Sequence, residues 1–312
     1  MRVTEKMTAN LMVQTIQQGL ERNQNLQEQA SSGLKINAPS DDPLAAQQVL
    51  QLKGVLQDNA QYAKNITTGN AWLGQMDNAM SEMGNIVSRA NEIAMSMASG
   101  TNNGTSRAQA ADEVKQLKSE LVQLGNTQVS GKYIFGGFVN DKPPFDTTAI
   151  NNPSDPLNGT PTGAYIGTDN DVTMQIGKGA YVAINYSGGQ LLRGGSPPGS
   201  TGVDMIGTLD TLITGLSNND TNAIQGTLPA LDQAKNQILA ARTVVGARTN
   251  HLQNASDDLD SMNVTLNKLV SDKEDADVIQ LYSDLTQQQN AFQSALAAAG
   301  KLSNLSLLDY LQ

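Results

Sequence analysis

The sequence contains no cysteine and one histidine among its 312 residues. Without cysteine the chain can form no disulfide, no thiolate nucleophile and no cysteine-ligated zinc site, and a single histidine excludes a metal site built from several histidines. Aromatic residues are also scarce, at 4% of the chain. Leucine, isoleucine, valine, methionine and alanine must therefore fill the core, which favours helices over sheets.

Excess positive charge and long apolar runs are lacking too. The formal net charge of −10 argues against nucleic acids and anionic membrane surfaces as partners, because both attract basic proteins. No stretch approaches about 18 consecutive apolar residues, so we expect no membrane insertion. Residues 1–7 contain no apolar run typical of a cleaved signal peptide, which by itself predicts a cytoplasmic protein.

Glycine and proline are concentrated in the middle of the chain. Residues 131–207 hold 15 of the 28 glycines, whereas the flanking sequence is dominated by alanine, glutamine, leucine and asparagine. Such a shift in composition predicts that the chain leaves a helical region, forms a different domain and returns. We predict three parts: a terminal coiled-coil assembly domain (1–42 with 272–312), a helical rod domain (43–142 with 203–271) and a β-rich outer domain (143–202).

Apolar residues repeat at helical spacing on both sides of this middle. From Leu231 to Leu269 they alternate in steps of three and four, interrupted at Arg248, as in the seam of a coiled coil. Upstream, similar spacing predicts a long helix that begins at Pro43 with Asp42 as its cap. A further helix is expected over about 105–129.

The two ends of the chain predict helices that are poor in large apolar residues. Residues 5–35 form one such segment, and Ser271 with Glu274 fits a capping box that starts another. A helix of this kind buries too little apolar area to be stable alone, so it needs the other end of the chain or further copies of the chain. The residues that we expect in an assembly interface are Leu11, Ile16, Leu20, Leu26, Leu34, Ile36, Asn37, Leu285, Phe292, Leu296, Leu305 and Leu308.

The middle of the chain has the pattern of short strands. Residues 173–176 and 181–186 predict a hairpin joined by the three-residue loop Gly177-Lys178-Gly179, and 133–135 and 165–166 predict additional strands. The proline-rich stretch 143–161 is expected to be an irregular loop.

Motifs that could carry chemistry fail on closer inspection. Gly177-Lys178-Gly179 lacks the third glycine of a dinucleotide-binding loop, and Asp169-Asn170-Asp171 lacks the glycine and the final acid of a calcium loop. The pairs Asp41-Asp42 and Asp257-Asp258 suit a helix cap and a solvated helix face, His251 suits a structural or surface role, and the methionines at 76, 80, 83 and 97 suit a helical core. We therefore predict no catalytic, metal or cofactor-binding residue, and no enzyme.

Three longer motifs resemble those of one family. Ser31–Pro43 resembles the "SSG-x-RIN-x-x-x-DD" signature of flagellins and their relatives, with Lys35 in place of the usual arginine. Val245–Leu252 is similar to the family's "GAR-x-N-x-L", and Ser271–Asp277 to its "S-x-x-EDAD". Gly131–Phe138 and the ending Leu305–Leu311 resemble the hook-associated members of this flagellin superfamily.

This resemblance implies a mainly α fold: an elongated multi-layer rod with terminal N- and C-helices as a coiled coil, a central helical bundle and a small β-rich inserted domain. It implies a structural subunit of the bacterial flagellum that joins the hook, through hook-associated protein 1, to the flagellin filament. Its partners would be further copies in a homo-oligomeric layer, hook-associated protein 1, flagellin and a flagellar export chaperone. Flagellar type III export without a cleaved signal replaces the cytoplasmic expectation with an extracellular one.

Two other functions stay open from the sequence. A filament subunit shares the terminal motifs but would polymerise without limit. A sugar-binding or adhesive outer domain would use Tyr165, Tyr181 and Tyr186 as exposed contacts.

Overall fold

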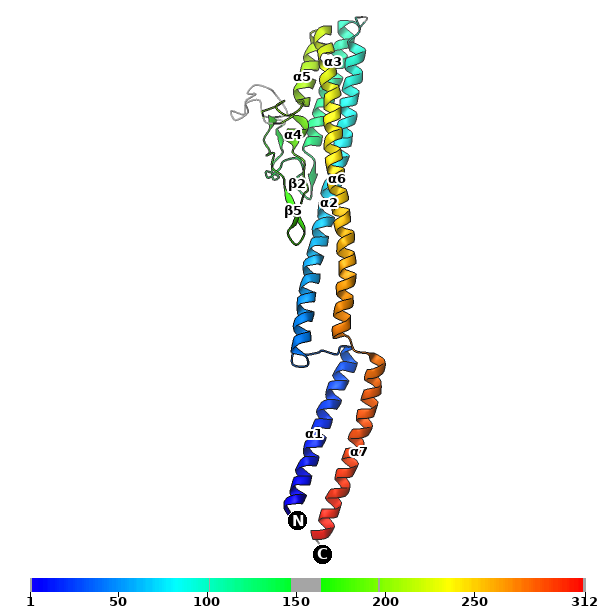
Figure 1. Cartoon of the computed structure of the whole chain (residues 1–312). Helices are drawn as coiled ribbons and strands as arrows, with labels where there is room; N and C mark the ends of the chain where they lie inside the picture. Colours follow the sequence, from blue (N-terminus) through cyan, green and yellow to red (C-terminus); the bar gives the residue numbers. More distant parts are fainter. Residues whose placement is uncertain (1, 101, 147–163, 196, 311–312) are drawn as a thin grey trace. The chain divides into compact units, whose positions relative to one another are not determined.

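A computed structural model describes all residues except 1, 101, 147–163, 196 and 311–312, with the side chains of 2–6, 8–9, 146 and 301–310 also left undescribed. The described residues are mainly helical (Figure 1). The helices are α1 (Arg2–Ser32), α2 (Pro43–Met97), α3 (Gly104–Gly125), α4 (Gly188–Leu192), α5 (Met205–Ser217), α6 (Thr221–Glu274) and α7 (Val278–Tyr310). The mainly α fold class predicted from the sequence is confirmed.

The strands described lie between α3 and α4 and form three antiparallel pairs. They are β1 (Gln128–Val129) with β2 (Lys132–Tyr133), β3 (Phe145–Asp146) with β4 (Ala164–Tyr165), and β5 (Thr173–Gly177) with β6 (Ala180–Ala183). Most of the predicted irregular loop 143–161 lies outside the described residues.

Two predicted ends in this region need correction. The third helix ends at Gly125 rather than near 129, because Asn126 caps it and the chain turns through Ser130 and Gly131, both at positive φ, into β2. The β5–β6 hairpin has a two-residue turn rather than a three-residue loop, since Gly177 pairs with Ala180 and Gly179 supplies the positive φ.

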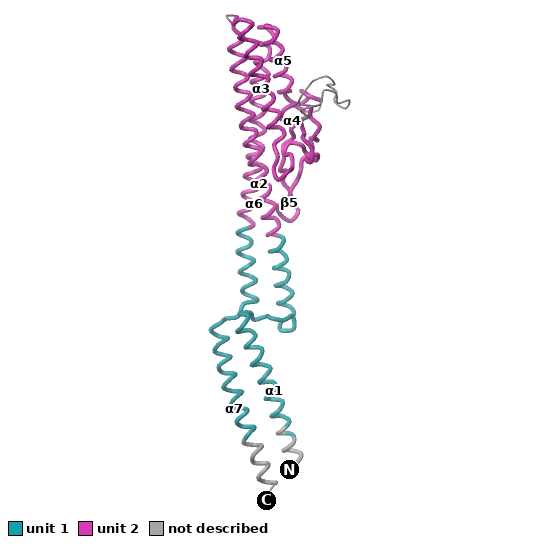
Figure 2. The backbone as a smooth tube through the Cα atoms, turned by 180° about the vertical axis from the view of Figure 1, so that it is seen from behind, with its two compact units in different colours: residues 1–58, 260–312 teal, residues 59–259 magenta. Residues whose placement is uncertain are grey.

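The chain divides into two compact units, which Figure 2 shows in different colours. Unit 1 comprises residues 1–58 and 260–312, and unit 2 comprises residues 59–259. Two helices, α2 and α6, each have residues in both units. The three-domain division inferred from composition stays a prediction.

Unit 2 has a continuous apolar core. It unites the buried faces of α2, α3, α5 and α6 with Phe135, Phe145 and Ile176 from the strand region. The methionines 76, 80 and 83 are fully buried in it, as their helical spacing predicted. Ion pairs add contacts between helices, among them Arg242 of α6 with Asp77 of α2 (2.8 Å).

Arg248 interrupts the apolar seam of α6 because it contacts the strand region. Its guanidinium donates a hydrogen bond to the main-chain carbonyl of Asn185 and lies 3.6 Å from the carboxylate of Asp171. From the other long helix, α2, the Asn65 side-chain amide donates a hydrogen bond to the carbonyl of Gln175 (2.8 Å). Helix α2 is thus bound to the β5–β6 hairpin itself, and α6 is bound to the residues that flank it.

The three tyrosines expected as exposed contacts of an adhesive domain are not all exposed. Tyr165 is half-buried against the core, and its hydroxyl lies within hydrogen-bond distance of the carbonyls of Phe135 (3.1 Å) and Thr168 (2.9 Å). Tyr186 is half-buried and packs on the core, so Tyr181, at 60% exposure, is the one of the three that faces solvent.

Candidate assembly site

The two terminal helices lie side by side in unit 1 (Figure 1). Their contact depends on Gly19 of α1, because a side chain there would begin 3.2 Å from the ring of Phe292 on α7. The Gln288 amide also donates to the main-chain carbonyl of Gly19 (3.3 Å). We call α1 and α7 the terminal pair.

The structure places the predicted interface residues in three environments. Leu11, Leu20 and Leu296 are exposed, with Leu11 at 65%. Ile16, Leu26, Leu34, Asn37, Leu285 and Phe292 are half-buried, and Ile36 is buried within the chain itself. The side chains of Leu305 and Leu308 lie outside the described residues. Leu11 and Ile16 line a small pocket together with Met12 and Thr15 of α1 and Ala295 of α7.

In unit 1 many more large apolar residues are exposed than are buried. Its described side chains include three buried apolar residues, namely Ile36, Val49 and Leu281. Its large exposed apolar residues are Met7, Leu11, Val13, Leu20, Leu44, Leu50, Val55, Met262, Val264, Leu269, Val278, Ile279, Tyr282 and Leu296. Exposed apolar surface on this scale is typical of an interaction site rather than of a finished monomer surface.

The first family motif, Ser31–Pro43, forms the linker between α1 and α2. Gly33, at φ +73°, ends α1, and the carboxylate of Asp41 accepts hydrogen bonds from the amides of Asn37 (3.0 Å) and Ala38 (2.9 Å). The next residue, Asp42, accepts from the amide of Ala45 and caps α2 as predicted.

The third motif, Ser271–Asp277, contains the end of α6 and leads into α7, and here the predicted cap is wrong. The α6 helix continues through Ser271 to Glu274, because no glycine or proline interrupts it. The cap of α7 is Asp277, whose carboxylate accepts from the amides of Ile279 (3.0 Å) and Gln280 (3.2 Å). The Ser271 hydroxyl instead donates to Asp275.

These two motifs, far apart in sequence, meet in the structure. Leu34 and Asp275 form an isolated antiparallel bridge. The amide of Lys35 donates to the carbonyl of Glu274 (2.6 Å), and the amide of Ala276 donates to that of Gly33 (3.0 Å). The signatures that identify the family therefore build the junction from which the terminal pair leaves.

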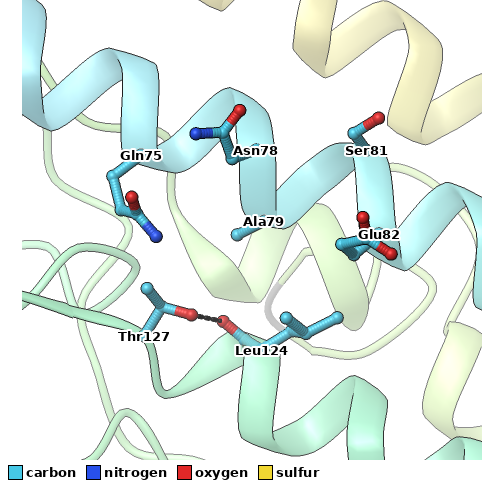
Figure 3. Close-up of a pocket in the computed structure, with 7 residues that line it drawn as sticks. All are labelled: Gln75, Asn78, Ala79, Ser81, Glu82, Leu124 and Thr127. Carbon is cyan, nitrogen blue, oxygen red and sulfur yellow. Dashed lines mark hydrogen bonds between the residues drawn. The ribbon is translucent and has the colours of Figure 1, made fainter.

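The residues described elsewhere offer little for chemistry. A polar hollow on unit 2 lies between α2 and the end of α3 and is lined by Gln75, Asn78, Ala79, Ser81, Glu82, Leu124 and Thr127 (Figure 3). The Thr127 hydroxyl donates to the carbonyl of Leu124 (2.7 Å), and the lining contains no nucleophile paired with a base. Among the described residues no group of three or more acidic or histidine side chains is placed to hold a metal ion.

None of the helices described is long and apolar enough to cross a membrane.

Comparison with known proteins agrees with this architecture. The bacterial flagellin N-terminal helical region matches residues 3–140, and the C-terminal helical region matches residues 228–311. Flagellar hook-associated protein 3 of Salmonella typhimurium is 28% identical over 301 residues, which cover 90% of each chain. A flagellin of Listeria monocytogenes is 25% identical over 300 residues, covering 94% of this chain and 93% of its own.

The fold has a counterpart among solved structures. A Vibrio parahaemolyticus protein assigned as flagellar hook-associated superposes with a TM-score of 0.66 over 75% of this chain and 100% of its own, at 20% identity. The helical ends and their matches define the class, a structural protein of the bacterial flagellum. The chain belongs to the flagellin superfamily, whose two terminal helical regions together match most of it, and it is similar to hook-associated protein 3 over 90% of its length.

Sequence reasoning missed two residues that make contacts within unit 1. Gly19 gave no signal, because one glycine in a helix has many possible causes. Lys53 of α2, which pairs with Glu274, lies 221 residues from its partner and belongs to none of the motifs. Only the fold brings such a pair together.

Proposed function

We propose that this chain is the structural subunit that joins the flagellar hook to the flagellin filament. The observation that carries the proposal is the contrast within one chain between a packed unit 2 and the open apolar surface of unit 1. The likeness to hook-associated protein 3, which extends over 90% of each chain, supports the same role.

Burial between copies would drive the assembly. Each fully buried leucine contributes about 2 kcal/mol relative to an exposed one, so the open side chains of unit 1 can offset the entropy lost when subunits associate. The asparagine and glutamine residues of α1 suit close packing of like helices, because neutral amides can bond across an interface without the cost of burying a charge.

The proposed partners follow from this role. Copies of the chain would form one layer, hook-associated protein 1 would contact it on the hook side and flagellin on the filament side. An export chaperone would hold the chain before type III export, which needs no cleaved signal peptide. The finished subunit would then lie outside the cell, as part of the flagellum.

The proposal is tested by deleting the gene and labelling the restored protein. We expect cells without it to release flagellin monomers, and electron microscopy to place the labelled chain in a short band between hook and filament. Filaments that stay attached without the chain would contradict the proposal. A label spread along the whole filament would instead identify a filament subunit, the alternative that the flagellin match keeps open.

A second experiment tests the interface itself. Leu20→Gln removes an exposed leucine of α1, and we expect less of the variant in isolated hook–filament junctions at equal export. The matched control is Leu239→Gln, an exposed leucine on α6 in unit 2. An equal loss in both variants would remove the support for a terminal interface.

A further inference from the structure

The two linkers of unit 1 are fastened to each other rather than running separately. Linker 33–42 joins α1 to α2, and linker 275–277 joins α6 to α7. The Leu34–Asp275 bridge and its two flanking main-chain hydrogen bonds cross from one linker to the end of the other. Each terminal helix would otherwise pivot independently on its own flexible peptide.

Glu274 connects this bridge to a third segment. Its carbonyl accepts the hydrogen bond from the amide of Lys35, and its two carboxylate oxygens each lie 2.7 Å from the Lys53 ammonium on α2. The Glu274 side chain is 13% exposed and that of Lys53 50%. A largely covered carboxylate held by both oxygens fixes its partner better than a freely solvated surface pair does.

We propose that these contacts form a clasp, closed by Lys53 and Glu274, which fixes the direction in which α1 and α7 leave the linkers. With the clasp closed, both ends of the chain enter the flagellar layer as one pre-arranged pair, and less conformational freedom is lost on assembly. Two main-chain hydrogen bonds and one ion pair are few, so the clasp can open without unfolding unit 2. The positioning purpose rests on the proposed function, whereas the clasp itself is a property of the monomer.

The absence of cysteine allows a direct measurement in the full chain. In an antiparallel bridge flanked in this way, the two residues face each other with Cα atoms about 4.5 Å apart, which is within disulfide range. We expect Leu34→Cys with Asp275→Cys to form a disulfide readily in glutathione buffers. The mismatched control, Leu34→Cys with Asp272→Cys, lies about one helical turn away and is expected to oxidise at least tenfold less favourably.

Charge reversals in this cysteine pair then test the role of Glu274. Lys53→Glu or Glu274→Lys alone is expected to lower the equilibrium constant for disulfide formation about fivefold, and the double reversal to restore it to within about twofold. Lys273→Glu, one residue from Glu274 and outside the clasp, makes the same charge change and is expected to have little effect. The clasp is overturned if Lys53→Glu behaves like Lys273→Glu, or if the double reversal fails to recover.

A final comparison separates the clasp from the proposed function. In cells, without the cysteines, Lys53→Glu is expected to reduce incorporation into the junction, and the double reversal to restore it, with the Trp72 fluorescence of unit 2 unchanged in the purified proteins. Normal incorporation of a chain whose clasp is loosened in vitro overturns the positioning role. A parent chain that is absent from the junction overturns the proposed function but leaves the thiol measurements valid.

Discussion

The apolar seam of α6 has one half in unit 2 and the other in unit 1, and the two halves differ in burial. Along α6, Leu252 is fully buried in unit 2, whereas Leu269, on the same seam, is 43% exposed in unit 1. The sequence repeats the same spacing through both halves. What differs is the packing: the first half shares one apolar core with residues of α2, α3, α5 and the strand region, whereas Leu269 in the second half is not part of that core.

This difference separates two uses of the same pattern. In unit 2 the apolar seam stabilises the monomer, because every buried side chain has partners within the chain. In unit 1 the chain itself leaves the seam exposed, so under the proposed function the seam would contribute to stability only after assembly. Four experiments test this difference between the two units.

The largest effect is expected from removing one terminal helix. Deletion of residues 275–312 takes away α7 and the Leu34–Asp275 bridge. We expect loss of incorporation at the junction and of export-chaperone binding. Unit 2 should remain folded, because its core lies within residues 59–259. Urea unfolding followed by Trp72 fluorescence checks the fold, and collapse of that transition would contradict the independence of unit 2.

A matched pair of leucine substitutions on α6 comes next. Leu252→Ala creates a cavity in unit 2 and is expected to lower its free energy of unfolding by about 2–5 kcal/mol. Leu269→Ala, on the same helix and seam, should change the monomer by less than about 0.5 kcal/mol, yet weaken assembly. Urea titration of both proteins measures the first effect, and junction occupancy the second. Equal destabilisation by the two substitutions would mean that the seam around Leu269 is covered within the monomer.

A smaller effect is expected from filling the contact between α1 and α7. Gly19→Val puts a branched side chain where a Cβ alone would lie 3.2 Å from the Phe292 ring. We expect the terminal pair to separate and become more sensitive to limited proteolysis, while the unfolding midpoint of unit 2 stays constant. Gly54→Val, at a glycine of α2 in unit 1 with open space around it, is the control. Resistance to protease equal to that of the parent would show that the pair adapts.

The smallest effect concerns the strand region at alkaline pH. Burial raises the pKa of Tyr165 to about 12 from its ordinary value of 10.0. Because the pKa is higher in the folded state, the stabilisation is complete below pH 10 and is lost as pH rises through about 12. For unit 2 the expected decrease in the free energy of unfolding is about 1 kcal/mol at pH 11.

Tyr165→Phe should remove this part of the pH dependence, although it also loses hydrogen bonds at neutral pH. Tyr181→Phe, at an exposed position, should leave the alkaline profile unchanged. The measurement is the free energy of urea unfolding from pH 8 to 11 for the three proteins. Parallel profiles for the parent and Tyr165→Phe would show that this tyrosine is not responsible.

Local signals predicted local structure well. Pro43 begins α2 and Asp42 caps it, as the sequence indicated, because a cap needs only residues within one turn. The cap at Ser271 failed for a related reason: the capping pattern was present, but a preceding helix with no breaker satisfied the same amides. The early end of α3 depended on a β-turn pair, Ser130 and Gly131, that follows it.

The helical class, the apolar seams, the cap of α2 and the membership in the flagellin superfamily can all be predicted from the sequence, because each is encoded in neighbouring residues or in long motifs. The tertiary structure alone decided where the α6 seam is covered, and that the two motifs meet at Leu34 and Asp275. The ion pair between Lys53 and Glu274 likewise depends on the tertiary structure. Periodicity tells which face of a helix is apolar, but whether that face is buried depends on elements that reach it from distant parts of the chain.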